Sequence, residues 1–243
     1  KRQTLMFSAT MPPKIRALAT KILTNPVELS TAISKPAEGV LQAAYVCYEE
    51  QKIPLINSLI ADKEDCQSIL IFSSTKKKVT QIVHSLKRKK MDAVGISSDL
   101  EQKERESVLM QFRNRQIRIL VATDVLSRGI DVKDINLVIN FDVPGDAEDY
   151  VHRVGRTARA SATGVALTLI NSDDMYKFEQ IEALIGETVY KIPMPLELGP
   201  GPEWKVASRK KGGRSGKNFN RKKSGGSRKE KTGQAVRTSK RTE

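Results

Sequence analysis

The sequence predicts an α/β fold in which a parallel sheet is covered by helices on both faces. Two observations carry this prediction, and both concern about residues 40–195. Short apolar segments with strand character alternate with segments whose apolar residues recur at helical spacing. The apolar segments are also nearly continuous, which is typical of parallel strands buried on both faces. The connections between such strands are expected to be right-handed.

The first 33 residues read as a separate block. Residues 1–7 and 27–29 have strand character, and the apolar residues between them recur at helical spacing after a pair of prolines. This block has no partner strands of its own. We therefore expect a remnant of a domain that lies mostly upstream, mobile or loosely docked, followed by a second domain over residues 34–195.

Strands and helices then follow one another along the second domain. Strands are predicted at residues 41–47, 68–72, 93–96, 117–122, 137–141 and 165–170. Helical spacing of apolar residues marks segments 52–61, 79–86, 108–112, the approach to His152, and 178–185. Prolines and glycines then close the domain. Residues 196–243, rich in Lys, Arg, Gly and Ser, are expected to be disordered because they offer too little apolar surface to fold.

Charge is distributed unevenly along the chain. Residues 205–243 hold 15 Lys and Arg against two acidic residues, whereas the rest of the chain holds 27 basic and 26 acidic residues. Such a polycationic tail indicates a polyanionic partner, most simply nucleic acid, with a solubilising tail as the alternative. Two cysteines and two histidines exclude the usual metal-site spacings and fit reduced thiols in the cytoplasm. No run of 18 apolar residues predicts a membrane span.

The segment Tyr150–Arg159 concentrates three arginines and a histidine. On a helix, His152, Arg156 and Arg159 would share one face, although Gly155 is expected to disturb or end that helix. Clustered cations repel one another unless an anion lies among them, and the planar guanidinium fork matches phosphate oxygens in pairs. The pattern therefore predicts a phosphate site that uses Arg156 and Arg159. The alternative is a solvated basic helix end.

Polar residues follow three of the predicted strands, at Ser73–Thr75, Ser97–Asp99 and Thr123–Asp131. Ligands of open α/β sheets bind beyond the carboxyl ends of the strands, where hydroxyl groups and helix N-termini contact phosphates. Helix N-capping favours the same residue types and explains Thr75 and Asp99 equally well. The sequence Arg-Gly-Ile-Asp at the end of the third segment exceeds what a cap requires.

Three motifs occur in an order that resembles one protein family. They are Ser8-Ala9-Thr10, the segment Thr123–Asp131 and the segment His152–Arg159. Over about residues 1–195 the chain resembles the C-terminal half of a DEAD-box RNA helicase, a superfamily 2 enzyme. Segments 69–75, 102–105 and 138–142 are also similar to motifs of that family's second lobe. The Pro/Gly break and the basic tail are similar to the bacterial RhlE-type branch.

The resemblance implies a RecA-like lobe that closes with a first lobe on ATP, Mg²⁺ and RNA. Arg156 and Arg159 would be catalytic arginine fingers at the ATP phosphates. The residues implied in ATP binding or in coupling are Asp131, His152, Ser8 and Thr10. Those implied in RNA binding are Ser73, Thr75, Gln102, Arg105, Thr123, Arg128 and Gly129. The metal would be bound mainly by the first lobe, so none of its ligands is expected in this chain.

The sequence departs from a complete helicase of this family. It contains neither a Gly-x-x-x-x-Gly-Lys-Thr phosphate loop nor an Asp-Glu-Ala-Asp motif, so the chain alone is not expected to hydrolyse ATP. Ser97-Ser98-Asp99 stands where the family often has His-Gly-Asp, and alanines at 158, 160 and 162 stand where it often has glycine. A non-catalytic RNA-binding or annealing module is the alternative function.

The resemblance also sets expectations about partners. Single-stranded or structured RNA is the expected partner, with ribosomal precursors or the RNA-decay machinery as candidate settings. No membrane partner is expected, and the protein is expected to be a cytoplasmic monomer.

Overall fold

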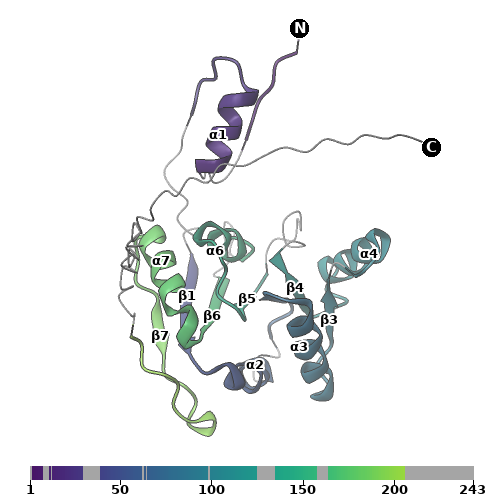
Figure 1. The fold of residues 1–243 in the computed structure, drawn as a ribbon. Coiled ribbons are helices and arrows are strands. Elements are labelled where there is room, and N and C mark those ends of the chain that lie inside the picture. Colours follow the sequence, from purple (N-terminus) through teal and green to yellow (C-terminus); the bar gives the residue numbers. More distant parts are fainter. Residues whose placement is uncertain are drawn as a thin grey trace, which may run out of the picture. The chain divides into compact units, whose positions relative to one another are not determined.

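A seven-stranded sheet organises the second domain (Figure 1). The computed structural model describes residues 2–7, 11, 13–29, 39–61, 63, 65–97, 99–124, 135–157 and 164–205. The strands are β1 (Val40–Val46), β2 (Ile69–Ser73), β3 (Ala93–Ile96), β4 (Ile119–Thr123), β5 (Leu137–Asn140), β6 (Gly164–Ile170) and β7 (Tyr190–Ile192). Their order in the sheet is β3-β4-β2-β5-β6-β1-β7, and neighbouring strands pair in parallel.

Helices alternate with these strands as predicted. They are α2 (Lys52–Ala61), α3 (Lys76–Arg88), α4 (Gln102–Arg113), α6 (Ala147–Val154) and α7 (Met175–Ile185). Within the described ranges, three short 3-10 turns lie at Glu49–Gln51, Ser172–Asp174 and Leu196–Leu198. Gly155 ends α6 as expected, and its backbone N–H donates to the Val151 carbonyl over 2.8 Å. Among the described residues, no helix combines the length and apolar character that a membrane span requires.

The core lies in two layers, one on each face of the sheet. Side chains of α2 and α3 pack with one set of strand residues, and those of α4, α6 and α7 pack with the alternate set. The central strands are buried on both faces, as Ile69 and Leu70 illustrate with no exposed surface. This double burial is why the strands read as continuous apolar runs rather than alternating ones. The three-layer prediction is confirmed.

Strands β2 and β5 are neighbours whose connections leave for opposite faces of the sheet. β2 leads into α3, which belongs to one layer, and β5 leads into α6, which belongs to the other. Right-handed crossovers require this arrangement, because the chain moves in one direction along the sheet after β2 and in the other after β5. Open parallel sheets place their ligand sites at such a switch point, beyond the carboxyl ends of the strands.

The described part of the first block contains one helix, α1 (Pro13–Ile22), as the helical spacing predicted. The predicted strand character of residues 1–7 and 27–29 was wrong for the part that the structure describes, because neither segment is a strand there. A strand needs a neighbour for its backbone hydrogen bonds. Phe7 and Leu29 are 88% and 92% exposed, which fits segments without a sheet to join.

The folded chain extends further than the sequence indicated. Residue 195 was expected to end the domain, but a 3-10 turn at Leu196–Leu198 and the packed ring of Trp204 follow that position. The Trp204 ring lies 6.2 Å from that of Phe178 in α7, and Gln51 Nε2 donates to the carbonyl oxygens of Leu198 and Pro200. The expectation of disorder from residue 196 is therefore corrected for residues 196–205. Residues 206–243 lie outside the described part.

Candidate functional site

The carboxyl ends of β2, β4 and β5 carry the polar groups of the candidate site. Ser73, Thr123 and Asn140 are the last residues of these neighbouring strands. Asp124 and Asp142 follow β4 and β5 within two residues. Two carboxylates thus lie at the switch point of the sheet, and each is matched by buried or half-buried cations.

Arg153 joins the end of β4 to helix α6. Its guanidinium makes two hydrogen bonds of 2.7 Å to the carboxylate of Asp124, and only 2% of the arginine is exposed. It also donates to Asn140 Oδ1 over 3.1 Å and stands 5.1 Å from the centre of the Phe72 ring. A two-point arginine–carboxylate pair fixes orientation as well as position. The start of the Thr123–Asp131 segment and the helix that leads to Arg156 are therefore held together.

Asp142 forms the centre of a second buried network. Its Oδ2 accepts hydrogen bonds from the Ser74 N–H (2.7 Å), the Ser74 hydroxyl (2.8 Å) and the Ser73 hydroxyl (3.1 Å). Its Oδ1 accepts from Lys78 Nζ over 2.6 Å and from Lys52 Nζ over 3.4 Å. Burial by itself raises the pKa of this carboxyl, but the bonds from Lys78 and Ser74 and the Lys52 charge outweigh burial and lower the pKa to about 2.

Glu49, in the 3-10 turn that follows β1, completes this network. Its carboxylate lies 2.9 Å from Lys52 Nζ and 2.5 Å from Lys78 Nζ. Burial opposes ionisation of both Glu49 and Lys78. Hydrogen bonds from Lys78 and Lys52 nevertheless lower the pKa of Glu49, and hydrogen bonds to Asp142 and Glu49 raise the pKa of Lys78. Lys52 is fully buried, and its ammonium stands 5.2 Å from the centre of the Phe141 ring. Two carboxylates and two ammonium groups therefore alternate, which satisfies each buried charge.

The predicted nucleotide-side residues of the described chain lie at the end of α6. The side chain of His152 is 36% exposed, and its Nδ1 lies 3.8 Å from Asp149 Oδ1. Arg156 follows the helix rather than continuing it, and its Nε donates to the His152 carbonyl over 3.2 Å. The predicted common helical face is thus interrupted at Gly155. The predicted residues Arg159, Asp131, Ser8 and Thr10 lie outside the described residues.

Comparisons with known proteins identify the kind of domain that carries these residues. The family model described as the helicase conserved C-terminal domain matches residues 51–161. The probable ATP-dependent RNA helicase ddx17 of Dictyostelium discoideum is 38% identical over 198 residues, which are 80% of this chain and 25% of that protein. The chain carries the C-terminal helicase domain of DEAD-box RNA helicases.

Solved DEAD-box structures confirm the predicted RecA-like fold. Dbp5 of S. cerevisiae, bound to RNA and ADP BeF3, superimposes with a TM-score of 0.71 at 28% identity. The match covers 77% of this chain and 50% of the Dbp5 chain. The E. coli DEAD-box protein SrmB, bound to RraA, gives a TM-score of 0.63 at 27% identity, over 69% of this chain and 98% of that one. The chain spans 25–39% of the length of curated relatives such as ddx17 and the DBP2 helicase of Candida glabrata.

Among the residues predicted to contact RNA, Thr75, Gln102 and Arg105 are at least partly exposed. Thr75 is exposed, and its hydroxyl accepts a hydrogen bond from the Lys78 N–H, so it caps α3 as the alternative interpretation proposed. Gln102 is exposed on α4 and accepts from Arg105 Nη1 over 3.2 Å. Arg105 Nη2 donates to the Leu100 carbonyl, while its Nε is buried without a partner among the described residues. Thr123 is 9% exposed at the end of β4.

Ser73 is a correction to the predicted set. It was expected to contact RNA, but it is fully buried and its hydroxyl donates to Asp142. A buried hydroxyl that already has an acceptor serves the fold rather than a ligand. The adjacent Ser74 is the exposed serine of this turn. Arg128 and Gly129, also predicted to contact RNA, lie outside the described residues.

Sequence reasoning missed the residues that hold the site together. Arg153 was counted only as one cation of a cluster, and Asp124, Asp142, Lys52 and Lys78 were given no role. A usable signal existed for the two aspartates, since each follows an apolar strand closely. No local pattern identified their partners.

Proposed function

We propose that this chain is the second lobe of an ATP-dependent RNA helicase that remodels RNA duplexes. The observation that carries the proposal is the two-point pair of Asp124 and Arg153. This pair ties the end of β4, where the segment beginning at Thr123 starts, to α6, the helix that leads to Arg156. The pair therefore holds together the elements that carry Arg156, a candidate phosphate-binding residue, and Thr123, a candidate RNA contact.

The nucleotide would bind at the carboxyl-end edge of the sheet, at the part next to the end of α6. ATP supplies the phosphoanhydride bond whose cleavage drives the cycle. Arg156 would stabilise the charge that develops on the phosphates, and Arg159 would act with it; an arginine of this kind is worth roughly 10³–10⁵ in rate. The described residues include no group of three or more His, Cys, Asp or Glu that could hold a metal. As the resemblance implies, Mg²⁺ would be held mainly by the first lobe.

RNA would run along the remaining part of the edge. Thr75, Gln102, Arg105 and Thr123 offer hydroxyl, amide and guanidinium groups at or near the carboxyl ends of β2, β3 and β4. Groups of this kind contact phosphates and ribose hydroxyls rather than base edges. We therefore expect recognition of the RNA backbone with little sequence preference.

The finer assignments belong to the same proposal. A segment rich in proline and glycine, residues 193–202, precedes the basic tail, and this order supports the bacterial RhlE-like branch. We further propose a cytoplasmic monomer that works on ribosomal precursors or with the RNA-decay machinery. The molar mass of the purified protein, measured by light scattering, tests whether it is a monomer. Sequencing of RNA crosslinked to it in cells identifies the substrate.

RNA-stimulated ATP hydrolysis tests the central proposal. It is measured on this chain and on the longer protein that includes the sequence upstream. We expect turnover only from the longer protein, and a loss of about 10³-fold on Arg156→Ala. Lys87→Ala, which removes an exposed cation at the end of α3, is the matched control and leaves turnover unchanged.

The alternative function has its own outcome in this experiment. A longer protein that binds RNA and never turns over ATP would be a non-catalytic RNA-binding or annealing module. Turnover by this chain alone would place the nucleotide site elsewhere.

A further inference from the structure

Helix α3 presents one exposed face that carries a cation at each end. Lys77, Gln81, His84 and Arg88 follow one another at intervals of four, three and four residues, so they lie in one narrow strip of the helix surface. All four residues are exposed. With a rise of about 1.5 Å per residue, the strip is about 16 Å long. We call these four residues the basic face of α3.

No carboxylate of the helix balances these charges. Residues 76–91 contain seven Lys and Arg and no Asp or Glu. Two of the lysines are matched from elsewhere in the fold, since Lys76 pairs with Asp99 and Lys78 pairs with Asp142. Within the described part of the chain, the side chains of the basic face have neither an ion-pair nor a hydrogen-bond partner. Helix α4, in contrast, mixes acidic and basic residues.

The place of Lys77 in the helix is unfavourable without a bound anion. Lys77 lies in the first turn of α3, where the helix dipole is positive and disfavours a cation. At the other end, Arg88 is followed by Lys89 and Lys90, and neighbouring like charges repel one another. The dipole favours cations at that end, so a solvated helix end would account for Arg88 but not for Lys77. An anion along the face would relieve both repulsions.

The side chains of the basic face fit a nucleic-acid backbone better than a protein surface. Each of them carries positive charge or can donate a hydrogen bond, and phosphate and sugar oxygens accept from such groups. None of them is aromatic or aliphatic. Protein partners are held mainly by large anchors such as Trp, Tyr and Arg in well-packed pockets, and this flat polar strip offers no such pocket. The chemistry of the face therefore favours a polynucleotide over an acidic protein.

The basic face also begins where a candidate RNA contact lies. Thr75 is exposed and caps the first turn of α3, and Lys77 follows two residues later. Helix α3 packs on β2, β3 and β4, the strands whose carboxyl ends carry or adjoin the candidate RNA contacts (Figure 1). A helix that connects parallel strands runs back along the sheet. The basic face therefore leads away from the carboxyl-end edge, starting beside Thr75.

We propose that RNA leaving the carboxyl-end edge at Thr75 continues along the basic face of α3, so that the domain binds a longer stretch of RNA backbone than the edge alone holds. The contacts are to phosphate and sugar, without base readout. The arrival of RNA at Thr75 rests on the proposed function. Binding along α3 does not require ATP hydrolysis, so the path and the helicase activity can fail separately.

The dependence of RNA affinity on RNA length tests the path on this chain. Lys77→Gln combined with Arg88→Gln removes both cations of the face and keeps good helix formers. For oligouridylate of about 20 nucleotides, affinity is expected to fall about fivefold or more, as for two exposed ion pairs. The slope of log affinity against log salt should fall by about 1.4, or about 0.7 for each phosphate no longer neutralised. Oligouridylate of about six nucleotides, too short for both edge and face, should lose less than about twofold.

A matched control lies one residue from Arg88. Lys87 is an exposed cation of the same helix, but a step of about 100° places it on the neighbouring face, in line with Lys76. Arg88→Gln alone should lower the salt slope by about 0.7, whereas Lys87→Gln should leave it unchanged. The basic tail is the same in all these variants. Equal effects of the two substitutions would mean that net charge, rather than a defined path, attracts RNA, and would overturn the proposal.

The remaining outcomes are also decisive. Unchanged affinity and slope for the long RNA in the double variant would overturn the path. Unchanged RNA binding together with lost binding of a polyglutamate probe would assign the face to an acidic protein instead. Urea unfolding should show no loss of stability in the double variant, so that weaker RNA binding reports a lost contact. If the longer protein binds RNA and never turns over ATP, the proposed helicase function fails, and the binding data still decide the path along α3.

Discussion

At the scale of the residue, two arginines three positions apart have different tasks. Arg153 is 2% exposed and saturated by Asp124, Asn140 and the Asp142 carbonyl. Arg156 is half-buried after the end of the helix, where it can meet a ligand. The sequence shows both as cations in one cluster. Burial separates the residue that builds the site from the residue expected to act in it.

Replacing Arg153 should therefore cost stability, whereas replacing Arg156 should not. Arg153→Ala leaves Asp124 and the Asn140 oxygen without their donor, and breaking a buried ion pair costs about 3 kcal/mol or more. Arg156→Ala should change the free energy of unfolding by less than about 1 kcal/mol. Urea unfolding of this chain, followed by circular dichroism, measures both. Equal losses would mean that the two arginines share one structural role.

Asp142 gives the domain a specific sensitivity to acid. Its folded pKa is about 2, against 3.8 for an unperturbed carboxyl, so the ionised form is favoured by folding. The contribution is fully present above the unfolded pKa and is lost as the pH falls from about 4 through 2. The shift corresponds to about 2 kcal/mol. Unfolding free energies measured across this window should fall with acid, and Asp142→Asn should flatten that part of the curve. A variant with the same pH slope as the unaltered chain would contradict the assignment.

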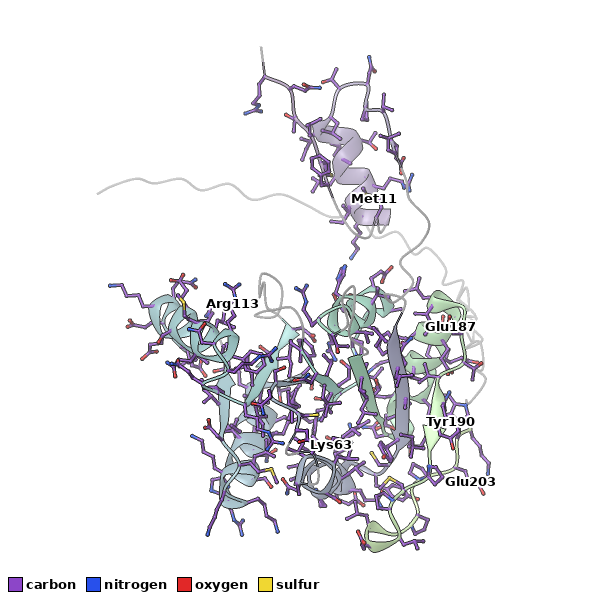
Figure 2. All side chains as sticks on the ribbon, turned by 180° about the vertical axis from the view of Figure 1, so that it is seen from behind. Met11, Lys63, Arg113, Glu187, Tyr190 and Glu203 are labelled. Atoms are coloured by element: carbon purple, nitrogen blue, oxygen red, sulfur yellow. The ribbon has the colours of Figure 1, made fainter. Side chains whose placement is uncertain are left out.

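At the scale of the element, local patterns found strands β1 to β6 and the helices, but they missed β7 and the closing segment of the domain. Residues 196–205 contain glycine, proline and few apolar residues, so they read as unstructured. They are ordered because they make hydrogen bonds and packing contacts with other parts of the chain. Gln51 binds their carbonyl groups, and Trp204 packs against Phe178. Figure 2 shows Tyr190 of β7 and Glu203 on the same side of the domain, with Arg113 on the opposite side.

Gly201 is the tightest point of that closing segment. A Cβ at this position would lie 1.9 Å from the Val46 carbonyl oxygen, which is main chain and cannot rotate away. Gly201→Ala should therefore displace residues 196–205 and cost about 1–3 kcal/mol, the usual range for overpacking. Trp204 is the one tryptophan of the chain, so its fluorescence should shift towards the red.

A matched control for this substitution exists in the same domain. A Cβ at Gly145 would meet nothing within 4 Å, and Gly145→Ala should leave both the fluorescence and the unfolding free energy unchanged. An unshifted Trp204 spectrum in Gly201→Ala would show that the closing segment can move aside without loss.

At the scale of the whole molecule, the net positive charge is concentrated in the C-terminal tail. The tail from Lys205 holds 15 of the 42 basic residues and two of the 28 acidic ones. Phosphate binding by such a tail depends steeply on salt and weakly on sequence. The folded edge supplies defined hydroxyl and guanidinium groups, whereas the tail would supply affinity for any nearby strand. The two parts should therefore respond differently to ionic strength.

Deleting residues 206–243 should weaken RNA binding and make it less dependent on salt. For single-stranded RNA, the slope of log affinity against log salt should fall by about 0.7 for every phosphate that the tail no longer neutralises. Fluorescence anisotropy titrations at several salt concentrations measure the slope. A tail of the same composition in scrambled order is the control and should restore it. An unchanged slope after deletion would support a tail that only increases solubility.

The sequence by itself determined the alternation of strands and helices, the end of α6 at Gly155 and the edge at which the site lies. These features depend on residues within a few positions of one another, where periodicity and backbone preference act directly. The tertiary structure alone decided that Ser73 is buried, that Arg153 belongs to Asp124 and that Asp142 joins two connections. Those partners are 29 and 64 to 90 positions apart in the chain. Only the order of the strands in the sheet brings them together, and no local pattern carries that order.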